Sequence, residues 1–378
     1  MERRWAESPY NRRNGGPLDR LEDFLTHPDM RRWHRERFRL MIDELGHSPR
    51  VLAWELFNEI DLWPRATPAQ VAAWIDEMAA FVRDYERRRW GRTRLITVSA
   101  ASATPQGEMA EVIFNHPALD FATVHHYVGP GIRRPRNTVD AALEVQLAVR
   151  YGLSHIRDRR PYLDSESGPI EAWIADEAFD VRYYHNMSWA HLMSGGAGQG
   201  LRWPYRNPHI LSPGMHRVQQ AMARFVRAVD WNRFHPDPLG RELHVTAPGA
   251  PGGALRAFGI ADPDQILAWI LHDRDRFPGP VEGAVLHLEG RTPGLYTARY
   301  WDTFTGQETG RASARVGGDG LLSLPLPPFS DSLALIIESG ETGGLQSPEG
   351  ARRLDGPPSP PSPPSSEGPA DGRPAGPP

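Results

Sequence analysis

The sequence predicts an α/β fold, followed by a smaller antiparallel β region and an unstructured tail, on three observations. Residues 1–235 alternate strand-like apolar runs with amphipathic helical segments, which is the pattern of a parallel sheet. Residues 240–338 contain short β-rich runs separated by Gly, Pro and Asp, as in a small antiparallel β-sandwich. Residues 339–378 are mostly Pro, Ser and Gly. That composition cannot bury a core, so we expect disorder there.

Length and composition exclude several classes of protein. A chain of 378 residues is long enough for two domains with a sizeable core. Its net charge of −4 gives no reason to expect nucleic acid or an anionic membrane as a partner. The absence of cysteine excludes disulfides, thiolate metal sites and a cysteine nucleophile. No run of about 18 apolar residues is present, and the N-terminal residues do not form a signal peptide.

Apolar periodicity and the residues at element ends define the helices and strands of the first region. Thr67 and Pro68 suit a helix N-cap and first turn, and Gly46 suits a helix end. The expected helices are 28–46, 68–90, 139–156, 178–193 and 215–229. The expected strands are 51–57, 95–99, 121–127, 162–165 and 200–204. These are five strands, whereas a closed parallel barrel needs eight. Farther along, residues 302–306 are typical of a hairpin turn.

The first chemically informative segment is the apolar run 51–57, which Asn58 and Glu59 follow directly. A glutamate after a buried parallel strand lies at the carboxyl end of the sheet, where barrel enzymes hold their catalytic groups. In the cleavage of a glycosidic bond, one carboxyl group must stay protonated to give its proton to the leaving oxygen. A helix N-cap or a loop ion pair is the alternative role of an isolated Asn-Glu pair.

A second glutamate, Glu166, follows the strand-like run 162–165 and precedes Gly168. Most glycosidases cleave the glycosidic bond with two carboxyl groups that face each other across the site, here from different strands. A retaining mechanism needs an ionised carboxylate as its nucleophile, and a solvated glutamate at a strand end is the alternative. Asp164 is a rival on the same segment. Strand alternation predicts that Asp164 and Glu166 share a face, with Glu166 nearer the end of the strand.

Three polar aromatic residues, His125, His126 and Tyr127, close the strand at 121–127. Alternation puts His125 and Tyr127 on one face, where a tyrosine hydroxyl could hydrogen-bond the nucleophile. Adjacent histidines also suggest a metal, but no third ligand follows at a motif spacing, so we expect none. Trp203 closes the last strand, and its indole could line a sugar subsite or equally pack in the core.

Taken together, these strand ends resemble the strand-four, -six, -seven and -eight signatures of clan A glycoside hydrolases. They are most similar to glycoside hydrolase family 5, of cellulase and β-mannanase type. The matching motifs are an Asn-Glu acid/base motif, a His-x-Tyr motif, a Glu-x-Gly nucleophile motif and a last-strand tryptophan, here Asn58-Glu59, His125–Tyr127, Glu166–Gly168 and Trp203. The resemblance spans roughly residues 5–235. It includes Asn11 in a segment that looks like the family's loop after strand three.

The resemblance implies a role for each matching residue. Glu59 would be the acid/base and Glu166 the nucleophile of a retaining β-glycosidase that acts by double displacement, without cofactor or metal. The implied substrate-binding residues are Asn58, for the sugar 2-hydroxyl, with His125, Tyr127, Trp203 and Asn11. The implied partner is a β-linked, mannan- or cellulose-like carbohydrate. Which sugar is bound, the oligomeric state and the compartment stay open. The resemblance implies a secreted or periplasmic bacterial enzyme if the full-length gene carries a signal peptide.

The resemblance also implies a partial (β/α)8 TIM barrel, from about the loop after strand three to helix eight. Strands one to three would be missing, and with them the family's strand-two arginine near the nucleophile. We therefore expect a fragment of a longer enzyme. The alternative is a truncated, inactive protein that only binds carbohydrate. An adaptor built on the β-sandwich and the Pro-rich tail would leave residues 1–235 unexplained, and the tail lacks a repeated Pro-x-x-Pro pattern flanked by basic residues.

Overall fold

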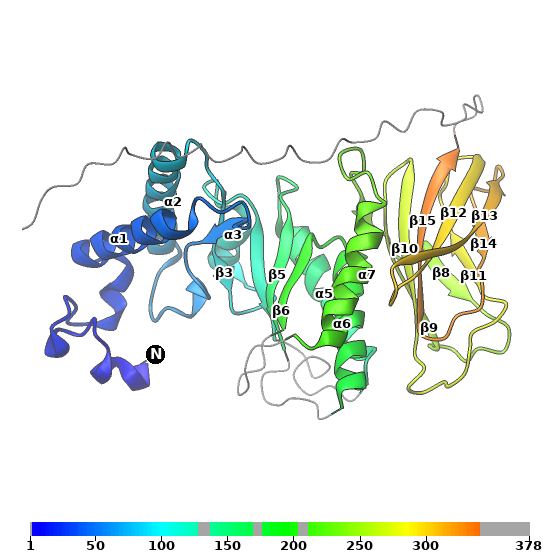
Figure 1. Cartoon of the computed structure of the whole chain (residues 1–378), viewed down its shortest axis with the longest axis horizontal. Coiled ribbons are helices and arrows are strands. Elements are labelled where there is room, and N and C mark those ends of the chain that lie inside the picture. Colours follow the sequence, from blue (N-terminus) through cyan, green and yellow to red (C-terminus); the bar gives the residue numbers. More distant parts are fainter. Residues whose placement is uncertain (1, 128–136, 169–175, 203–210, 341–378) are drawn as a thin grey trace, which may run out of the picture. The chain divides into compact units, whose positions relative to one another are not determined.

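The computed structural model describes residues 2–127, 137–168, 176–202 and 211–340, and its first part is a parallel sheet with intervening helices (Figure 1). The strands of this part are β1 (Ala53–Glu55), β2 (Leu95–Thr97), β3 (Ser99–Ala100), β4 (Ala122–His126), β5 (Tyr162–Ser167) and β6 (Gly198–Arg202). All of their pairings are parallel. The α/β fold is therefore as predicted.

Strands β2 and β3 act as one strand that is interrupted at Val98. Their partner β1 continues to pair beyond its own end, because the Leu56 N–H donates to the Thr97 carbonyl and the Ser99 N–H donates to the Phe57 carbonyl. With β2 and β3 counted once, the sheet has the five predicted strands, in the order β1, β2/β3, β4, β5, β6. Parallel pairing places the carboxyl ends of all these strands at the same edge of the sheet.

The helices connect the strands in chain order. They are α1 (Pro28–Leu45), α2 (Pro68–Trp90), α3 (Gly107–Asn115), α5 (Asp140–His155), α6 (Glu177–Leu192) and α7 (Pro213–Arg227). Short 3₁₀ segments are η1 (Glu2–Glu7), η2 (Arg12–Asn14), η3 (Leu21–Leu25) and η4 (Ile60–Leu62). The five predicted helices are confirmed to within two residues at each end. Thr67 caps α2 as expected, in a capping box with Gln70. Sequence reasoning missed α3, which is short and begins without a side-chain cap.

A buried ion pair fixes the chain where it enters β1. Arg94 pairs with Glu86, and both side chains are almost fully buried. The same guanidinium donates to three carbonyl oxygens, those of Gly46 at 2.7 Å, Ser48 at 2.6 Å and Val51 at 2.8 Å. A buried charge is tolerated only when its donors are satisfied in this way. The network ties the end of α1 and the approach to β1 to the segment after α2.

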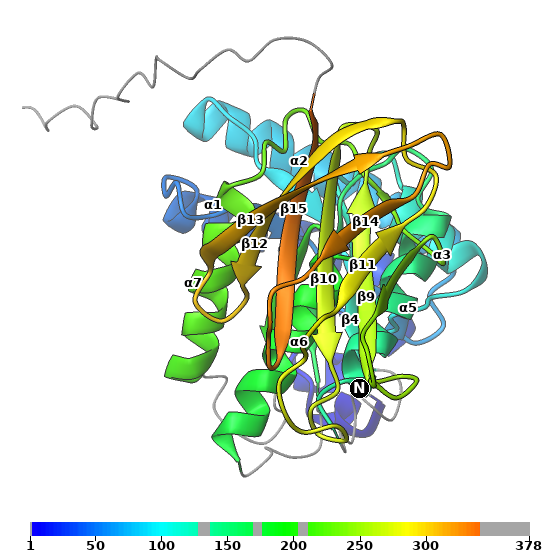
Figure 2. The same cartoon turned by 90° about the vertical axis from the view of Figure 1, so that its right-hand side faces the viewer.

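Residues 237–340 form two antiparallel sheets (Figure 2). The strands are β7 (Asp237–Pro238), β8 (Leu243–Thr246), β9 (Leu255–Ala261), β10 (Gln265–His272), β11 (Val285–Leu288), β12 (Gly294–Asp302), β13 (Gln307–Val316), β14 (Leu322–Pro325) and β15 (Ser332–Gly340). The six-stranded sheet has the order β13-β12-β15-β10-β9-β7, and the three-stranded sheet has the order β14-β11-β8. The predicted turn at 302–306 joins β12 to β13. β15 extends to Gly340, and the rest of the predicted tail, 341–378, lies outside the described residues.

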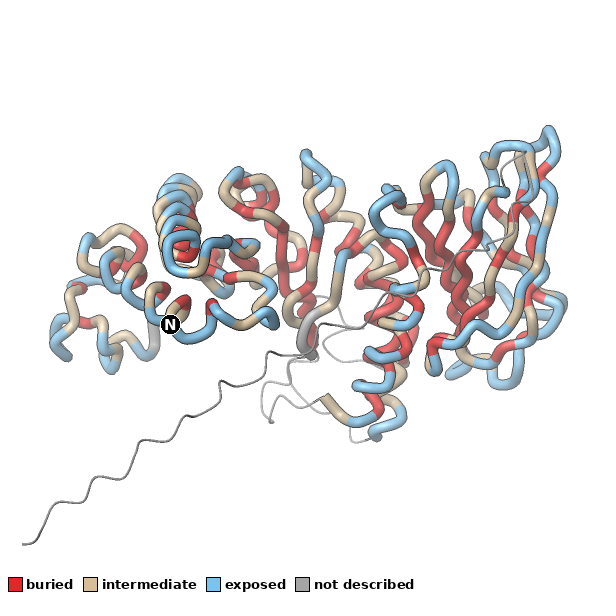
Figure 3. Tube along the Cα trace, turned by 45° about the horizontal axis from the view of Figure 1, so that its top comes forward, coloured by how far each residue is buried: buried red, intermediate tan, exposed pale blue. Residues whose placement is uncertain are grey.

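The two middle strands of the six-stranded sheet, β10 and β15, are buried over most of their length, which explains why they are almost entirely apolar (Figure 3). On one face, Trp269 of β10 belongs to the same core as Trp189 of α6 and Phe225 of α7. On the other face, Ile270 packs in a core with Leu286 of the three-stranded sheet. A strand that is buried on both sides has no polar alternation, because neither face meets water.

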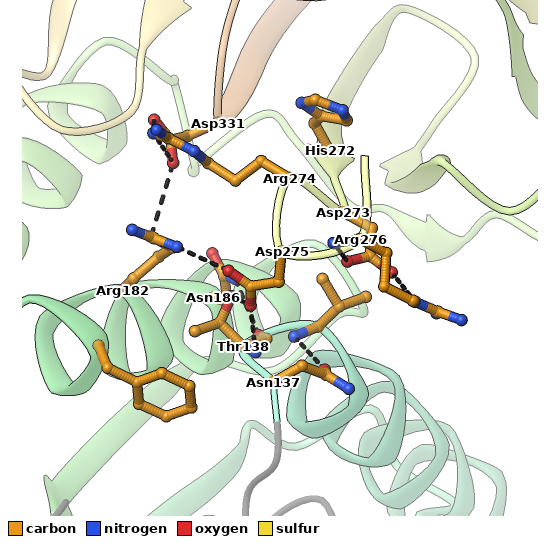
Figure 4. Close-up of polar contacts among 12 residues, drawn as sticks. Asn137, Thr138, Arg182, Asn186, His272, Asp273, Arg274, Asp275, Arg276 and Asp331 are labelled. Carbon is orange, nitrogen blue, oxygen red and sulfur yellow. Dashed lines mark hydrogen bonds and ion pairs between the residues drawn. The ribbon is translucent and has the colours of Figure 1, made fainter. Parts of the chain in front are cut away.

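Polar contacts also join the loop after β10 to the beginning of α5 and to α6 (Figure 4). The Asp275 carboxylate accepts hydrogen bonds from the backbone N–H and the hydroxyl of Thr138, both at 3.1 Å. Arg182 of α6 donates to Asp275 at 2.9 Å and lies 3.6 Å from Asp331, which also accepts from Arg274 at 2.8 Å. The C-terminal sheet thus helps to hold the start of α5. None of the described helices has the length and apolar character needed to cross a bilayer.

Candidate active site

The turn after β1 carries Asn58 and Glu59. Glu59 has a left-handed backbone conformation, with φ 56° and ψ 51°, which costs a residue other than glycine about 1–3 kcal/mol. Its backbone N–H donates to the Ser99 hydroxyl of β3 at 2.9 Å, so the neighbouring strand holds the turn in place. Strained residues of this kind concentrate at functional sites.

His125 of β4 bridges the two glutamates that the sequence singled out. Its Nδ1 atom lies 2.8 Å from Glu59 Oε1 and 3.4 Å from Glu166 Oε2. One carboxylate oxygen of each glutamate and the histidine nitrogen all lie within 4.8 Å of one another. The histidine is buried, whereas the Glu59 and Glu166 side chains are 24% and 18% exposed. The fold therefore brings two solvent-accessible carboxyl groups from separate strands to one place.

Tyr127 holds the second glutamate. Its hydroxyl donates a hydrogen bond to Glu166 Oε2 at 2.8 Å. Burial, reinforced by the negative charge of Glu166, raises the pKa of Tyr127 well above its usual value, so the hydroxyl stays protonated and remains a donor. A hydroxyl that donates to a carboxylate stabilises the ionised carboxylate. The predicted shared face of His125 and Tyr127 is confirmed, because both contact Glu166.

The predicted shared face of Asp164 and Glu166 is wrong. Asp164 contacts His126, with 3.5 Å between Asp164 Oδ2 and His126 Nδ1, whereas Glu166 contacts His125 on the opposite face of β4. The cause is a bulge. In the register of β4 and β5, Val124 pairs with Asp164 and His125 with Glu166, which leaves Ser165 as an extra residue. One extra residue reverses the alternation for all residues that follow it.

Two further carboxyl groups near the glutamates were missed from the sequence. Glu55 of β1 is exposed as a residue, but protein atoms surround its carboxyl group, and this loss of solvation raises its pKa. The negative charge of Glu166 adds to the rise, whereas Ser99 and His125 oppose it. Burial also raises the pKa of Asp61, which accepts a hydrogen bond from the Ala101 N–H at 2.8 Å. The available signal was a glutamate inside an otherwise apolar strand, because a charged residue in such a run usually has a partner.

The positions of the other predicted site residues do not test their predicted roles in substrate binding. Asn58 is exposed beside Glu59. Asn11 is buried, its Oδ1 accepts from the Arg13 N–H at 3.0 Å, and its Nδ2 donates to the Trp5 carbonyl at 3.1 Å. That side chain caps η2, so a substrate contact by Asn11 stays a prediction. Trp203 lies outside the described residues.

Two groups of described side chains have the composition and spacing to hold a metal ion. The first is Glu59, His125 and Glu166, whose polar atoms already bond to one another and to Tyr127. The second is His126, Asp164 and His191, on the opposite face of β4 and β5 and fully buried.

The sequence is similar to those of plant enzymes that cut mannan. No family model matches the chain. Among curated proteins it is 24% identical over 251 residues to mannan endo-1,4-beta-mannosidase 3 of Arabidopsis thaliana, a match that covers 58% of the chain and 57% of that protein. It is 24% identical over 235 residues to mannan endo-1,4-beta-mannosidase 1 of Oryza sativa subsp. japonica, with 54% and 52% covered. The chain thus spans about half the length of these curated relatives.

The fold is similar to that of solved glycoside hydrolases. A family 5 glycoside hydrolase from Bacteroides vulgatus aligns with 82% of the chain and 67% of its own length, at a TM-score of 0.51 and 12% identity. A structure described as a glycoside hydrolase aligns with 83% of the chain and 70% of its own length, at a TM-score of 0.51 and 13% identity. In both fold and sequence the chain is therefore similar to glycoside hydrolases. The similarity to family 5, of cellulase and mannanase type, confirms the resemblance seen in the strand-end motifs.

Proposed function

We propose that this chain carries the catalytic centre of a retaining β-glycoside hydrolase that acts on a mannan-like β-linked polysaccharide. The observation that supports this most directly is the short separation between the carboxylate oxygens of Glu59 and Glu166, within 4.8 Å. Retaining enzymes hold their two carboxyl groups about 5–5.5 Å apart, whereas inverting enzymes need about 6.5–9.5 Å to admit a water molecule. The plant relatives, whose names specify mannan, favour that substrate class.

The roles of the two glutamates follow from their surroundings. Glu166, which accepts a hydrogen bond from the Tyr127 hydroxyl, is the proposed nucleophile. A Glu166 oxygen attacks the anomeric carbon and forms a bond to it. At the same time the glycosidic bond between that carbon and the leaving oxygen breaks, and Glu59 gives its proton to the leaving oxygen. Glu59 then removes a proton from the incoming water, the water oxygen bonds to the anomeric carbon, and Glu166 is released as a carboxylate. Asn58, beside Glu59, is the candidate for binding the sugar 2-hydroxyl, and His125 and Tyr127 keep the carboxyl groups in place.

The architecture of this proposal is a partial (β/α)8 barrel. Residues 1–235 correspond to the part from the loop after strand three to helix eight, and residues 240–338 to a β-sandwich that packs against α6 and α7. The support is the all-parallel order of β1 to β6, with the candidate site at the carboxyl ends of these strands, which is where barrel enzymes place catalytic groups.

Covalent trapping tests the proposal. The chain is incubated with 2-deoxy-2-fluoro-β-mannosyl fluoride and, separately, with its gluco counterpart, and the product is analysed by intact mass and peptide mapping. We expect a single sugar on Glu166, with faster labelling by the manno reagent. Glu166→Gln should take up no label. Glu44→Gln, which changes an exposed glutamate on α1, should label like the unchanged chain.

A folded chain that takes up neither sugar would overturn the catalytic proposal. In that case, binding of mannohexaose without hydrolysis would favour the alternative, a protein that only binds carbohydrate. Labelling that maps to Glu59 instead of Glu166 would reverse the two assigned roles. Circular dichroism of each variant separates loss of the site from loss of the fold.

A further inference from the structure

Behind the candidate active site, on the opposite face of β4 and β5, lies a second cluster of titratable side chains. It consists of His126 from β4, Asp164 from β5 and His191 from α6. All three are at most 1% exposed. One ligand atom of each lies within 4.8 Å of the other two. The proposed glycosidase chemistry uses none of these residues, because they face the helices and not the strand ends.

The polar atoms of this cluster have few partners. Among the described residues, no hydrogen bond of good geometry reaches either carboxylate oxygen of Asp164, Nδ1 of His126 or either ring nitrogen of His191. Unpaired polar groups in a protein interior are expensive. A cation bound among these side chains would supply the missing partner.

The spacing fits a tetrahedral ion better than a hydrogen bond. His126 Nδ1 and Asp164 Oδ2 are 3.5 Å apart, which is long for an N–H···O bond. Two ligands that each lie about 2.1 Å from a tetrahedral zinc ion are roughly 3.4 Å from each other. Two imidazoles and one carboxylate are a donor set that zinc accepts, with a water molecule or the second carboxylate oxygen in the fourth position.

The two histidine rings are held in fixed orientations. Tyr162 lies with its hydroxyl 3.0 Å from Nε2 of His126, which leaves Nδ1 turned toward Asp164. A metal-binding histidine is usually oriented in this way, through a hydrogen bond on its other nitrogen. The His191 ring stacks on Tyr162 with 5.9 Å between ring centroids. The Gly196 backbone packs so closely that a Cβ there would lie 2.1 Å from His191 Nε2. Only glycine leaves space for this ring.

We propose that His126, Asp164 and His191 form a buried structural site for a divalent transition-metal ion, with zinc the best fit. The ion would join β4, β5 and α6 from behind the candidate active site. It would hold Asp164 on the helix side of β5 and so maintain the bulge at Ser165, which turns Glu166 toward Glu59. No sequence motif predicts this site, because its third ligand, His191, comes from a helix that is distant in the sequence from the other two ligands.

Metal content and metal-dependent stability test the proposal without relying on activity. The full chain is expressed in zinc-supplemented medium, and bound metal is measured by plasma mass spectrometry after dialysis. We expect about one zinc ion per chain. The thermal midpoint of unfolding should fall when a chelator removes the zinc and recover when zinc is restored. Refolding with Co²⁺ should produce the visible absorption bands of a tetrahedral site.

Three variants locate the ion. Asp164→Asn keeps the size of the side chain but removes the charge, and should weaken zinc binding by more than about 100-fold, since even the loss of a supporting hydrogen bond costs 10- to 100-fold. His185→Asn is the matched control, because His185 is a fully buried histidine on α6 that does not belong to the cluster, and it should keep the ion. Glu166→Gln tests the other metal-capable group and should also keep it.

Two results would overturn the proposed metal site. An unchanged chain that carries no zinc, and whose thermal midpoint responds neither to zinc nor to a chelator, overturns the proposal whether or not any variant folds. Zinc that survives Asp164→Asn but disappears in Glu166→Gln would place the ion among Glu59, His125 and Glu166, and would also overturn it. Because none of these readouts measures hydrolysis, the metal site and the proposed glycosidase activity fail independently.

Discussion

Two clusters of histidine and carboxylate side chains lie on opposite faces of the same pair of strands, β4 and β5. On one face, His125 contacts Glu59 and Glu166, and Tyr127 donates to Glu166. These carboxyl groups are partly exposed and linked by hydrogen bonds. On the other face, His126 and Asp164 meet His191 in the interior, with no exposed carboxylate and few partners.

The difference shows that environment decides what histidine and carboxylate side chains can do. Solvent access lets the first cluster receive a substrate and exchange protons with water. Burial deprives the second cluster of water, so its carboxylate must be protonated, paired or bound to a cation. Amino-acid substitutions in and around the two clusters test whether this contrast holds.

The largest effect should come from Glu166→Gln. If Glu166 is the nucleophile, hydrolysis of an aryl β-mannoside should fall by at least about 10⁴-fold, since the loss of a nucleophile costs up to ~10⁶ in other enzymes. The thermal midpoint should stay close to that of the unchanged chain, because the side chain is partly exposed. Initial rates and calorimetry check both expectations. Equal activity in the variant and the unchanged chain would remove the first cluster from the chemistry.

A buried histidine outside both clusters should make folding sensitive to acid whether or not zinc is present. Burial lowers the pKa of His185 to about 4, an effect that its hydrogen bond to Asn186 opposes. The folded pKa is below that of the unfolded chain, about 6.5. Stability is therefore complete above about pH 6.5 and falls as the pH drops toward 4, by up to about 3 kcal/mol.

His185→Asn should flatten this acid limb of the stability curve by a similar amount. Chemical denaturation at several pH values between 4 and 7 measures the effect, with and without a chelator. Acid sensitivity that arises in the second cluster should change when zinc is removed, whereas the contribution of His185 should not. A curve with the same slope in the variant would show that His185 is not buried in its neutral form.

Tyr127→Phe should affect the first cluster alone. Loss of a hydrogen bond to a charged group costs about 1.5–3 kcal/mol, so kcat for an aryl β-mannoside should fall roughly 10- to 100-fold. Zinc content should not change. An unchanged kcat would contradict the role assigned to Tyr127.

The smallest effect should follow a change outside both faces. Arg182 is 26% exposed and contacts Asp275 and Asp331, so Arg182→Ala should cost about 1 kcal/mol of unfolding free energy. Arg157, an arginine on the surface that is 74% exposed and paired with Glu111, is the control, and Arg157→Ala should cost roughly 0–0.5 kcal/mol. Denaturant titration compares the two. Equal costs would mean that the Arg182 contacts drawn in Figure 4 add no more to stability than a surface ion pair.

Local patterns predicted much of the fold. Thr67 and Pro68 marked the start of α2, and the apolar run before Asn58 marked β1, because caps and periodicity act over a few neighbouring residues. The helix α3 was missed because it has only 9 residues and no side-chain cap. The candidate nucleophile and acid were found for the same local reason, since each comes at or soon after the end of an apolar strand-like run in the sequence, and their roles stay predictions.

Residues that are near one another in the chain were enough to predict most of the helices and strands of the first region, their order, and two glutamates close to the ends of parallel strands. Which carboxylate faces which histidine depends on contacts between segments that are distant in the sequence. The extra residue Ser165 in β5 reverses the alternation between Asp164 and Glu166, and a bulge is a property of the register between two strands. His191 reaches the second cluster through the packing of α6 on the sheet, which no pattern within one segment encodes.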